Sequence, residues 1–226
     1  MHLSEFKNRA EAGIHLAQAL KKFARKPDII ILALPRGGVP VGFEVAKKLK
    51  VPLDILLVRK LGAPGHEEMA VGAIAPDDHR VLNPDVVDIM GVSREEIRRI
   101  EEKELRELHR RMAAYRGNRP PPDLAGKTVI LIDDGLATGA TMQVAVDAVR
   151  DSGPKEIVVA VPTGAIDAVE RLEQSVDEVI CLLQPRQFFG VGAWYEDFRQ
   201  VPDKDVQRIL AEADDLGLSI DSNRKN

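Results

Sequence analysis

Two adjacent acidic residues, Asp133 and Asp134, end an apolar run and precede a loop of small residues in the stretch VILIDDGLATGATM. The run TVILID has the composition of a strand buried on both faces of a parallel sheet. Ligands bind such sheets outside the carboxyl ends of the strands. The loop 135–141 leads into a predicted helix, where backbone N–H groups and the helix dipole attract anions. We therefore expect an anion to bind in this loop.

An anion alone does not explain the acidic pair, because two carboxylates repel it. Neutral hydroxyl groups that donate hydrogen bonds to Asp133 and Asp134 do explain the pair, and a sugar phosphate offers hydroxyls and phosphate together. The simpler interpretation is a strand-to-helix turn with one aspartate as cap, which accounts for one carboxylate and one glycine but not for the whole run. The residues expected at the phosphate are Ala137, Thr138, Gly139, Ala140 and Thr141.

Cationic residues follow two other predicted strands. Residues 28–58 have the pattern of strand, glycine turn, helix and strand, which is typical of a βαβ unit. The sequence Pro35-Arg36-Gly37-Gly38 comes directly after the first of these strands, and Arg59-Lys60 comes after the second. Each position could be an ordinary connection, but an arginine beside two glycines favours an anion site.

VILIDDGLATGATM closely resembles the loop that binds phosphoribosyl pyrophosphate (PRPP) in type I phosphoribosyltransferases. The resemblance covers residues 28–183 and implies an α/β fold, with an open, mainly parallel sheet flanked by helices, a small hood and a flexible lid. It implies that Asp133 and Asp134 hold the ribose hydroxyls and that the loop holds the 5′-phosphate. The motifs NRAEAG, RPPPDLAGKTVILIDDG and GAWYEDF are similar to a little-characterised bacterial subgroup.

The resemblance also gives roles to the cations. Arg36, Gly37 and Gly38 match the pyrophosphate-binding loop, which in this family often contains a non-proline cis peptide. Arg36, Arg59 and Lys60 are the expected catalytic residues, since the diphosphate leaving group needs cationic partners. Mg²⁺ is expected as a cofactor held mainly by PRPP oxygens and waters. This explains why the sequence shows no dedicated metal site, since its five histidines have no metal-ligand spacing. Residues 59–92 form a long excursion rich in glycine, in which 71–75 and 79–83 could be short strands, and they match the lid.

The acceptor is not identified by the sequence. Phe188, Phe189, Trp194 and Tyr195 lie within a predicted hood segment, residues 184–200, and are expected to stack on a nucleobase-like acceptor. A small satellite core is an equally good interpretation. A PRPP-binding regulator with little or no catalysis is the alternative function, although the chain has no evident nucleic-acid-binding module. A hydrolase or isomerase of ribose phosphates would need a general base that we do not find.

The remaining elements complete a single predicted domain, residues 1–226. A first helix is expected over 4–25 with Ser4 as its cap. The segment 93–116 is expected to form an inserted, mostly solvated helix, with Glu and Arg interleaved and a narrow apolar stripe. From residue 127 strands and helices alternate, as in a parallel α/β sheet.

Composition and charge limit the classes of partner that we expect this protein to bind. The net charge is −4 and the pI about 5.8, which do not favour nucleic acid. Cys181, the single cysteine, lies in an apolar run and is expected to be a buried hydrophobe. No run is long enough to span a membrane, and the N-terminus has no apolar signal core. We expect a soluble cytoplasmic enzyme of nucleotide metabolism that uses PRPP and a small-molecule acceptor, with a homodimer left open.

Overall fold

Five parallel strands form the central sheet of the computed structural model, which describes residues 5–75, 80–117 and 119–220. Their order is β2-β1-β6-β7-β8. Four of the strands were predicted as continuous apolar runs close to their observed bounds, and the fifth, β2, is shorter than its run. The strands are β1 (Ile29–Ala33), β2 (Leu53–Ile55), β6 (Thr128–Ile132), β7 (Glu156–Thr163) and β8 (Glu178–Leu183).

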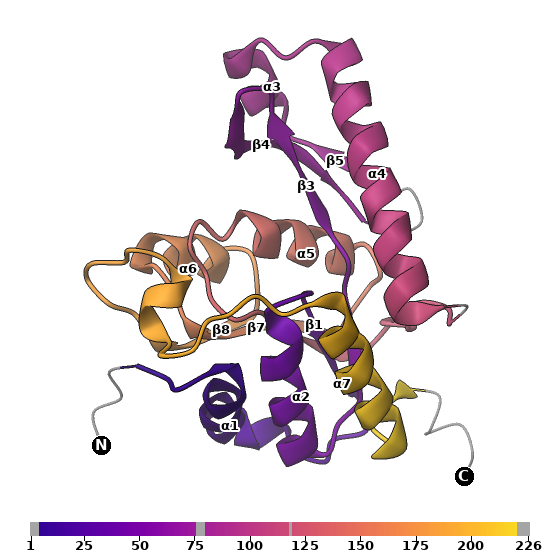
Figure 1. The fold of residues 1–226 in the computed structure, drawn as a ribbon, viewed down its shortest axis with the longest axis vertical. Coiled ribbons are helices and arrows are strands. Elements are labelled where there is room, and N and C mark those ends of the chain that lie inside the picture. Colours follow the sequence, from indigo (N-terminus) through magenta and orange to yellow (C-terminus); the bar gives the residue numbers. More distant parts are fainter. Residues whose placement is uncertain (1–4, 76–79, 118, 221–226) are drawn as a thin grey trace.

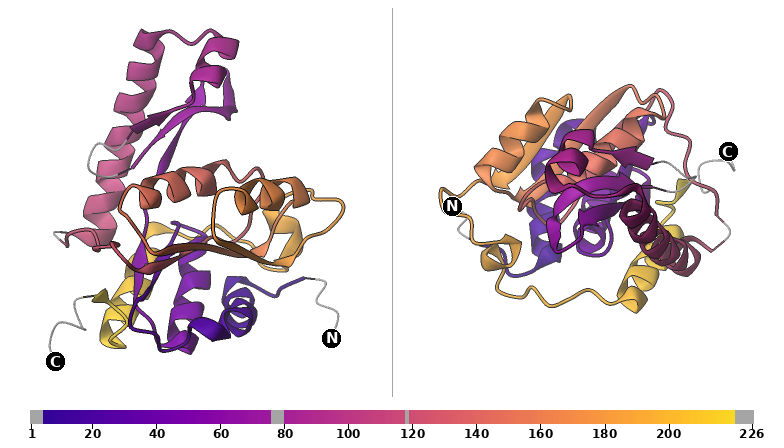
Figure 2. Two further views of the ribbon diagram at one scale, coloured as in Figure 1. Left: turned by 180° about the vertical axis from the view of Figure 1, so that it is seen from behind. Right: turned by 90° about the horizontal axis from the view of Figure 1, so that it is seen from above.

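Helices cover both faces of this sheet (Figures 1 and 2). Strand β1 shows why its whole sequence is apolar: Ile29 and Ile31 pack toward one layer of helices, and Ile30 and Leu32 toward the other. The first layer holds α1 (Arg9–Ala19), α2 (Gly38–Leu49) and α7 (Asp203–Asp215), and the second holds α5 (Ala140–Arg150) and α6 (Ile166–Glu173). The predicted α/β class, with an open parallel sheet flanked by helices, is confirmed.

A second unit, which we call the arm, stands off the core between β2 and β6 (Figure 1). It consists of β3 (Arg59–Ala63), β4 (His66–Ile74), β5 (Arg80–Leu82), α3 (Pro84–Met90) and α4 (Arg94–Arg116). Its strands form an antiparallel sheet. Residues 59–92 are therefore more regular than the glycine-rich excursion we expected, although short strands were anticipated near residues 71–75 and 79–83.

Helix α4 begins where the sequence predicted it. The side chain of Ser93 accepts a hydrogen bond from the backbone N–H of Glu96, and the Glu96 carboxylate accepts one from the backbone N–H of Ser93. This reciprocal capping box fixes the first turn. The predicted apolar stripe buries Ile97 and Leu108. Helix α4 thus packs on one side, against the arm strands and α7, and exposes much of its remaining surface.

The prediction of a first helix over 4–25 was wrong in its bounds. Helix α1 begins at Arg9, and the Asn8 side chain accepts from the backbone N–H of Glu11 as its cap. Phe6 cannot be helical, because its backbone N–H donates to Trp194 O at 2.9 Å and its carbonyl accepts from Glu196 at 2.8 Å. A short 3₁₀ helix, η1 (Lys21–Phe23), follows α1. Ser4 lies outside the described residues.

Cys181 lies partly buried in β8 and packs against the layer of α5 and α6. Burial raises the pKa of its thiol to about 12, so the thiolate is scarce at neutral pH. This fits the structural role that the sequence predicted. None of the helices in the described ranges combines the length and apolar character needed to cross a bilayer.

Candidate active site

The acidic pair lies where the sequence placed it, directly after β6 at the carboxyl edge of the sheet. Asp133 faces a cavity of about 650 Å³ between the core and the arm. We call this the site cavity. Strand β3, helix α4, the loop after β1 and the start of α5 all contribute to its wall. Its polar and charged lining residues are Arg59, Lys60, Lys103, Glu104, Arg111, Asp133 and Thr141.

The loop Pro35–Gly38 lies directly against the acidic pair. A Cβ atom added to Gly37 would sit 1.9 Å from Asp134 Oδ2, and one added to Gly38 would sit 2.5 Å from the Ile132 carbonyl oxygen. Such distances exclude any side chain at either position without movement of the loop. The peptide bond between Pro35 and Arg36 is cis, as the family resemblance anticipated. The paired glycines thus let this loop approach the acids.

The predicted phosphate loop joins β6 to α5. Gly139 caps α5 with a φ of +73°, a conformation that favours glycine, and Ala140 begins the helix. Ala137 and Thr138 are exposed, while Thr141 in the first turn lines the site cavity. The N-terminus of α5 therefore lies at the site cavity, and helix N-termini of this kind bind anions.

Arg9 is a site residue that the sequence did not reveal. Its Nε donates to Asp134 Oδ2 at 2.8 Å, and its Nη1 donates to the Arg199 carbonyl at 2.9 Å. Its guanidinium also lies 3.9 Å from the centre of the Phe198 ring. Because Asp134 is engaged in this ion pair and packed against Gly37, Asp133 is the member of the pair that faces the cavity.

Burial shifts both acids in the same direction. Desolvation, with the neighbouring charge of Asp134, raises the pKa of Asp133 well above its ordinary value. Desolvation also raises the pKa of Asp134, although the ion pair with Arg9 acts in the opposite direction. The Asp133 Oδ1 atom accepts the backbone N–H of Asp134 at 2.8 Å, which fixes one of its oxygens.

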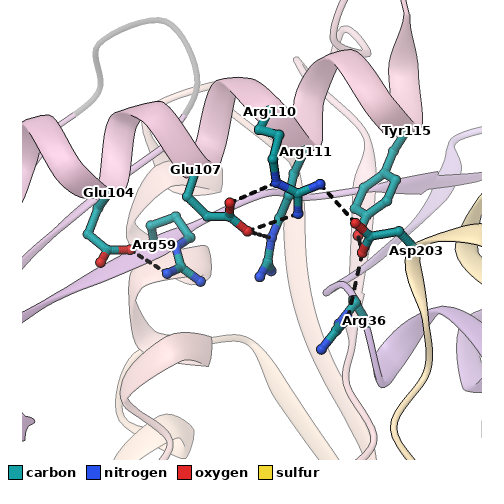
Figure 3. Close-up of polar contacts among 8 residues, drawn as sticks. All are labelled: Arg36, Arg59, Glu104, Glu107, Arg110, Arg111, Tyr115 and Asp203. Carbon is teal, nitrogen blue, oxygen red and sulfur yellow. Dashed lines mark hydrogen bonds and ion pairs between the residues drawn. The ribbon is translucent and has the colours of Figure 1, made fainter.

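The predicted catalytic arginines are both paired with acids, as Figure 3 shows. Arg59 donates from its Nε to Glu104 Oε2 of α4 at 2.7 Å. Arg36 lies 3.7 Å from Asp203 Oδ1 at the start of α7, through its Nη1. Lys60 lines the site cavity beside Arg59, whereas Arg36 is not among the residues of its wall.

Helix α4 carries a second layer of charged contacts around these arginines. Glu107 accepts from Arg110 and Arg111, and Asp203 accepts from Arg110 and from the Tyr115 hydroxyl (Figure 3). The hydrogen bond from Arg110, followed by that from Arg111, lowers the pKa of Glu107 to about 2. The sequence predicted α4 as a mostly solvated helix packing on one side and left open whether it belongs to the hood, so its contacts with the predicted catalytic arginines were missed. Interleaved Glu and Arg residues also occur on exposed helices, and no local signal distinguishes the two.

The predicted hood aromatics divide into two groups. Tyr195 is buried against Phe6 and Phe198, and its hydroxyl donates to the Asp134 carbonyl at 2.7 Å. Phe188 stacks on Trp194 with ring centres 6.5 Å apart, and Phe189 is 83% exposed. Tyr195 therefore forms part of a satellite core that supports the acidic pair, while the other three lie outside the site cavity wall.

Comparison with known proteins gives a consistent result. Residues 2–197 match the family model described as "Phosphoribosyl transferase domain". A Mycobacterium tuberculosis protein named "Putative phosphoribosyl transferase Rv0571c" is 45% identical over 208 residues, which cover 92% of this chain and 47% of that protein. The chain thus spans about half the length of the curated relatives it matches. "Bifunctional protein PyrR" of Corynebacterium diphtheriae is 26% identical over 149 residues, covering 62% of this chain and 55% of that protein.

A solved structure is similar to this chain in fold as well as in sequence. The crystal structure of TT1426 from Thermus thermophilus is 41% identical, with a TM-score of 0.81, and the match covers 92% of this chain and 98% of that one. The family model extends over most of the sequence and includes the acidic pair, the glycine pair and the phosphate loop. The chain therefore belongs to the phosphoribosyl transferase family.

Proposed function

We propose that this protein transfers the phosphoribosyl group of PRPP to a small-molecule acceptor and releases pyrophosphate. One observation carries the proposal: Asp133 and Thr141 share one cavity with Arg59 and Lys60, while the Gly37-Gly38 pair lies against the acids. Ribose hydroxyls, a 5′-phosphate and a diphosphate would each meet a group of suitable chemistry in this arrangement. Asp133 and Thr141 come from the carboxyl edge of the central sheet, and Arg59 and Lys60 come from strand β3 of the arm.

The proposed reaction is a displacement at C1 of the ribose. The bond between C1 and the diphosphate oxygen breaks, its electron pair leaves with the diphosphate, and a lone pair of the acceptor forms the new bond to C1. Asp133 would accept hydrogen bonds from ribose hydroxyls and so orient the ring. Arg59 and Lys60 would stabilise the negative charge that develops on the leaving group. Residues of β3 and α4 in the arm line the cavity and would help to exclude water from the activated sugar.

Mg²⁺ fits this site as a partner of the substrate. Asp134 Oδ2 already accepts from Arg9, and Asp133 Oδ1 accepts a backbone N–H. The acidic pair alone therefore offers too few oxygen ligands to bind the ion. PRPP oxygens and waters would supply most of its ligands. When bound, the ion would neutralise part of the diphosphate charge.

The acceptor is proposed to be nucleobase-like. The support is the stack of Phe188 on Trp194, with the exposed Phe189 next to Phe188 in the sequence. Trp194 adjoins Tyr195, whose hydroxyl donates to the Asp134 carbonyl. Planar bases stack favourably on such rings.

A panel of nucleobases and small amines, incubated with PRPP and Mg²⁺ and assayed for pyrophosphate, tests this function. We expect release that depends on one class of acceptor. PRPP binding without acceptor-dependent release across the panel would instead indicate a PRPP-binding regulator. Absence of PRPP binding would contradict both functions.

A further inference from the structure

Helix α4 brings additional cations to the site cavity. Lys103 and Arg111 line the cavity together with Arg59 and Lys60, on the wall opposite Asp133 and Thr141 of the core. Figure 3 shows Arg59, Arg111 and Arg36 following one another beneath α4, on the side of the helix that faces the core. These side chains come from the loop after β1, from β3 and from α4, so the fold gathers them from segments far apart in the sequence.

Arg111 is held in this position by one carboxylate. Its Nε donates to Glu107 Oε1 at 2.7 Å, and its side chain is 18% exposed. Glu107 remains ionised to low pH, because Arg110 and Arg111 lower its pKa to about 2. The hydrogen bond to Glu107 uses the Nε edge of the guanidinium, which leaves the terminal amino groups to donate to a ligand. An arginine oriented in this way suits bidentate recognition of phosphate oxygens.

The charge of the cavity indicates which part of a ligand lies here. Four cations, Arg59, Lys60, Lys103 and Arg111, face two acids in the cavity wall, Glu104 and Asp133. A neutral planar acceptor gives no reason for this excess of positive charge. The diphosphate of PRPP does, because it carries several negative charges and gains another as the bond to C1 breaks. The described contacts of Arg111 are with Glu107 alone, so a diphosphate would add to them.

We propose that Arg111 contacts the diphosphate of PRPP directly, and that Glu107 is the residue that positions it. This inference rests on the proposed function and extends it from strand β3 of the arm to helix α4. The longest helix of the arm then supplies part of the leaving-group site, beside Arg59 and Lys60 of β3. Arg111 would act beside Arg59, and the two would meet different oxygens of the diphosphate.

Arg110 provides a matched control within the same helix. It is the same residue type, one position away, and it also donates to Glu107. Its side chain is 51% exposed, its Nη1 donates to Asp203 at 2.9 Å, and it is not part of the cavity wall. Loss of either arginine removes one charge from α4 and one partner from Glu107, but only Arg111 faces the cavity.

The test is calorimetric titration of the full chain and three variants, Arg111→Ala, Arg110→Ala and Arg111→Lys, with Mg²⁺ present. The ligands are PRPP, inorganic pyrophosphate and ribose 5-phosphate. We expect Arg111→Ala to weaken PRPP and pyrophosphate binding by about tenfold or more, the usual effect of losing a charged hydrogen bond. Ribose 5-phosphate, which lacks the diphosphate, should bind all forms alike. Arg111→Lys should recover part of the loss, since it restores the charge without the bidentate geometry.

Equal effects of Arg111→Ala and Arg110→Ala on PRPP and pyrophosphate, with unfolding temperatures like that of the wild type, would overturn the inference. An equal loss of ribose 5-phosphate binding in Arg111→Ala would also overturn it, because Arg111 would then act on the site as a whole. Failure of the wild type to bind PRPP is a separate result. It would contradict the proposed function, while the pyrophosphate titration would still decide the role of Arg111.

Discussion

The ion pair between Asp134 and Arg9 gives the two adjacent acids, Asp133 and Asp134, different surroundings. Both side chains are largely buried, at 15% and 11% exposed, and Arg9 Nε lies 2.8 Å from Asp134 Oδ2. The guanidinium also stacks over Phe198. Arg9 thereby anchors α1 to the end of β6 and holds Asp134 in place, while Asp133 remains directed at the site cavity. The sequence predicted that both aspartates hold ribose hydroxyls, and for Asp134 this stays a prediction.

Arg9→Met should test this anchor. The variant keeps an apolar stem but removes the charge, leaving Asp134 buried without its cation, so we expect the free energy of unfolding to fall by about 2 kcal/mol. Urea denaturation at pH 7 measures the change. Arg199→Met is the control, because that side chain is 88% exposed and pairs with Asp197; it should cost less than about 0.5 kcal/mol. Equal losses in the two variants would show that Arg9 has no special role.

The pKa of Asp133 gives a second prediction at this scale. Folding raises the pKa of this buried carboxyl, so the folded protein binds the proton more tightly than the unfolded chain. The wild type therefore loses stability relative to Asp133→Asn as the pH rises. The loss begins near the pKa of an unfolded aspartate, about 3.9, and continues through the higher pKa of Asp133 in the folded protein. Each pKa unit of difference corresponds to about 1.4 kcal/mol.

Denaturation curves from pH 3.5 to 7.5 measure this difference. We expect the two proteins to be similar at the acidic end and Asp133→Asn to be the more stable at pH 7. A variant that is less stable at neutral pH, or a difference independent of pH, would show that the burial of Asp133 does not penalise its charge.

At the scale of elements, the sequence predicted the core and helix α4 well and the strands of the arm poorly. The central strands are continuous apolar runs because both of their faces are covered, and that pattern survives in the sequence. In the arm, β3 and β4 each contain a glycine and β5 has only three residues, so their strand pattern in the sequence is weak. The bounds of α1 could not be predicted either, because the pairing of Phe6 with residues 194–196 joins segments from opposite ends of the sequence.

The start of α4 was predictable because its signal is local. Ser93 and Glu96 form the complete capping box, and Ser93→Ala should remove one half of it. We expect a loss of about 1 kcal/mol in stability, together with faster amide hydrogen exchange in the first turns of α4. Hydrogen exchange followed by mass spectrometry measures the local change. Ser152→Ala, an exposed serine after α5, is the control, and similar exchange rates in both variants would contradict the capping role.

At the scale of the whole molecule, the site is built where the arm meets the core. The core supplies Asp133 and Thr141, and the arm supplies Arg59, Lys60 and the cations of α4. Helix α7 of the core supplies Asp203. Asp203 lies near Arg36 of the core and accepts hydrogen bonds from Arg110 and Tyr115 of the arm. This one carboxylate therefore connects the arm to the loop Pro35–Gly38. The motif near residue 133 predicts the donor half of the proposed reaction, but contacts of this kind between distant segments leave no trace in sequence spacing.

The proposed function requires that PRPP binds at the carboxyl edge of the central sheet through Asp133. Calorimetric titration of the wild type and Asp133→Asn with PRPP and Mg²⁺ tests it most directly, with Asp147→Asn as a control acid on α5 outside the site cavity. We predict that the wild type and Asp147→Asn bind alike and that Asp133→Asn binds about tenfold to a hundredfold more weakly, because hydrogen bonds to a charged carboxylate are lost. A wild type that does not bind PRPP, or an Asp133→Asn variant that binds it as tightly as the wild type, would contradict the account.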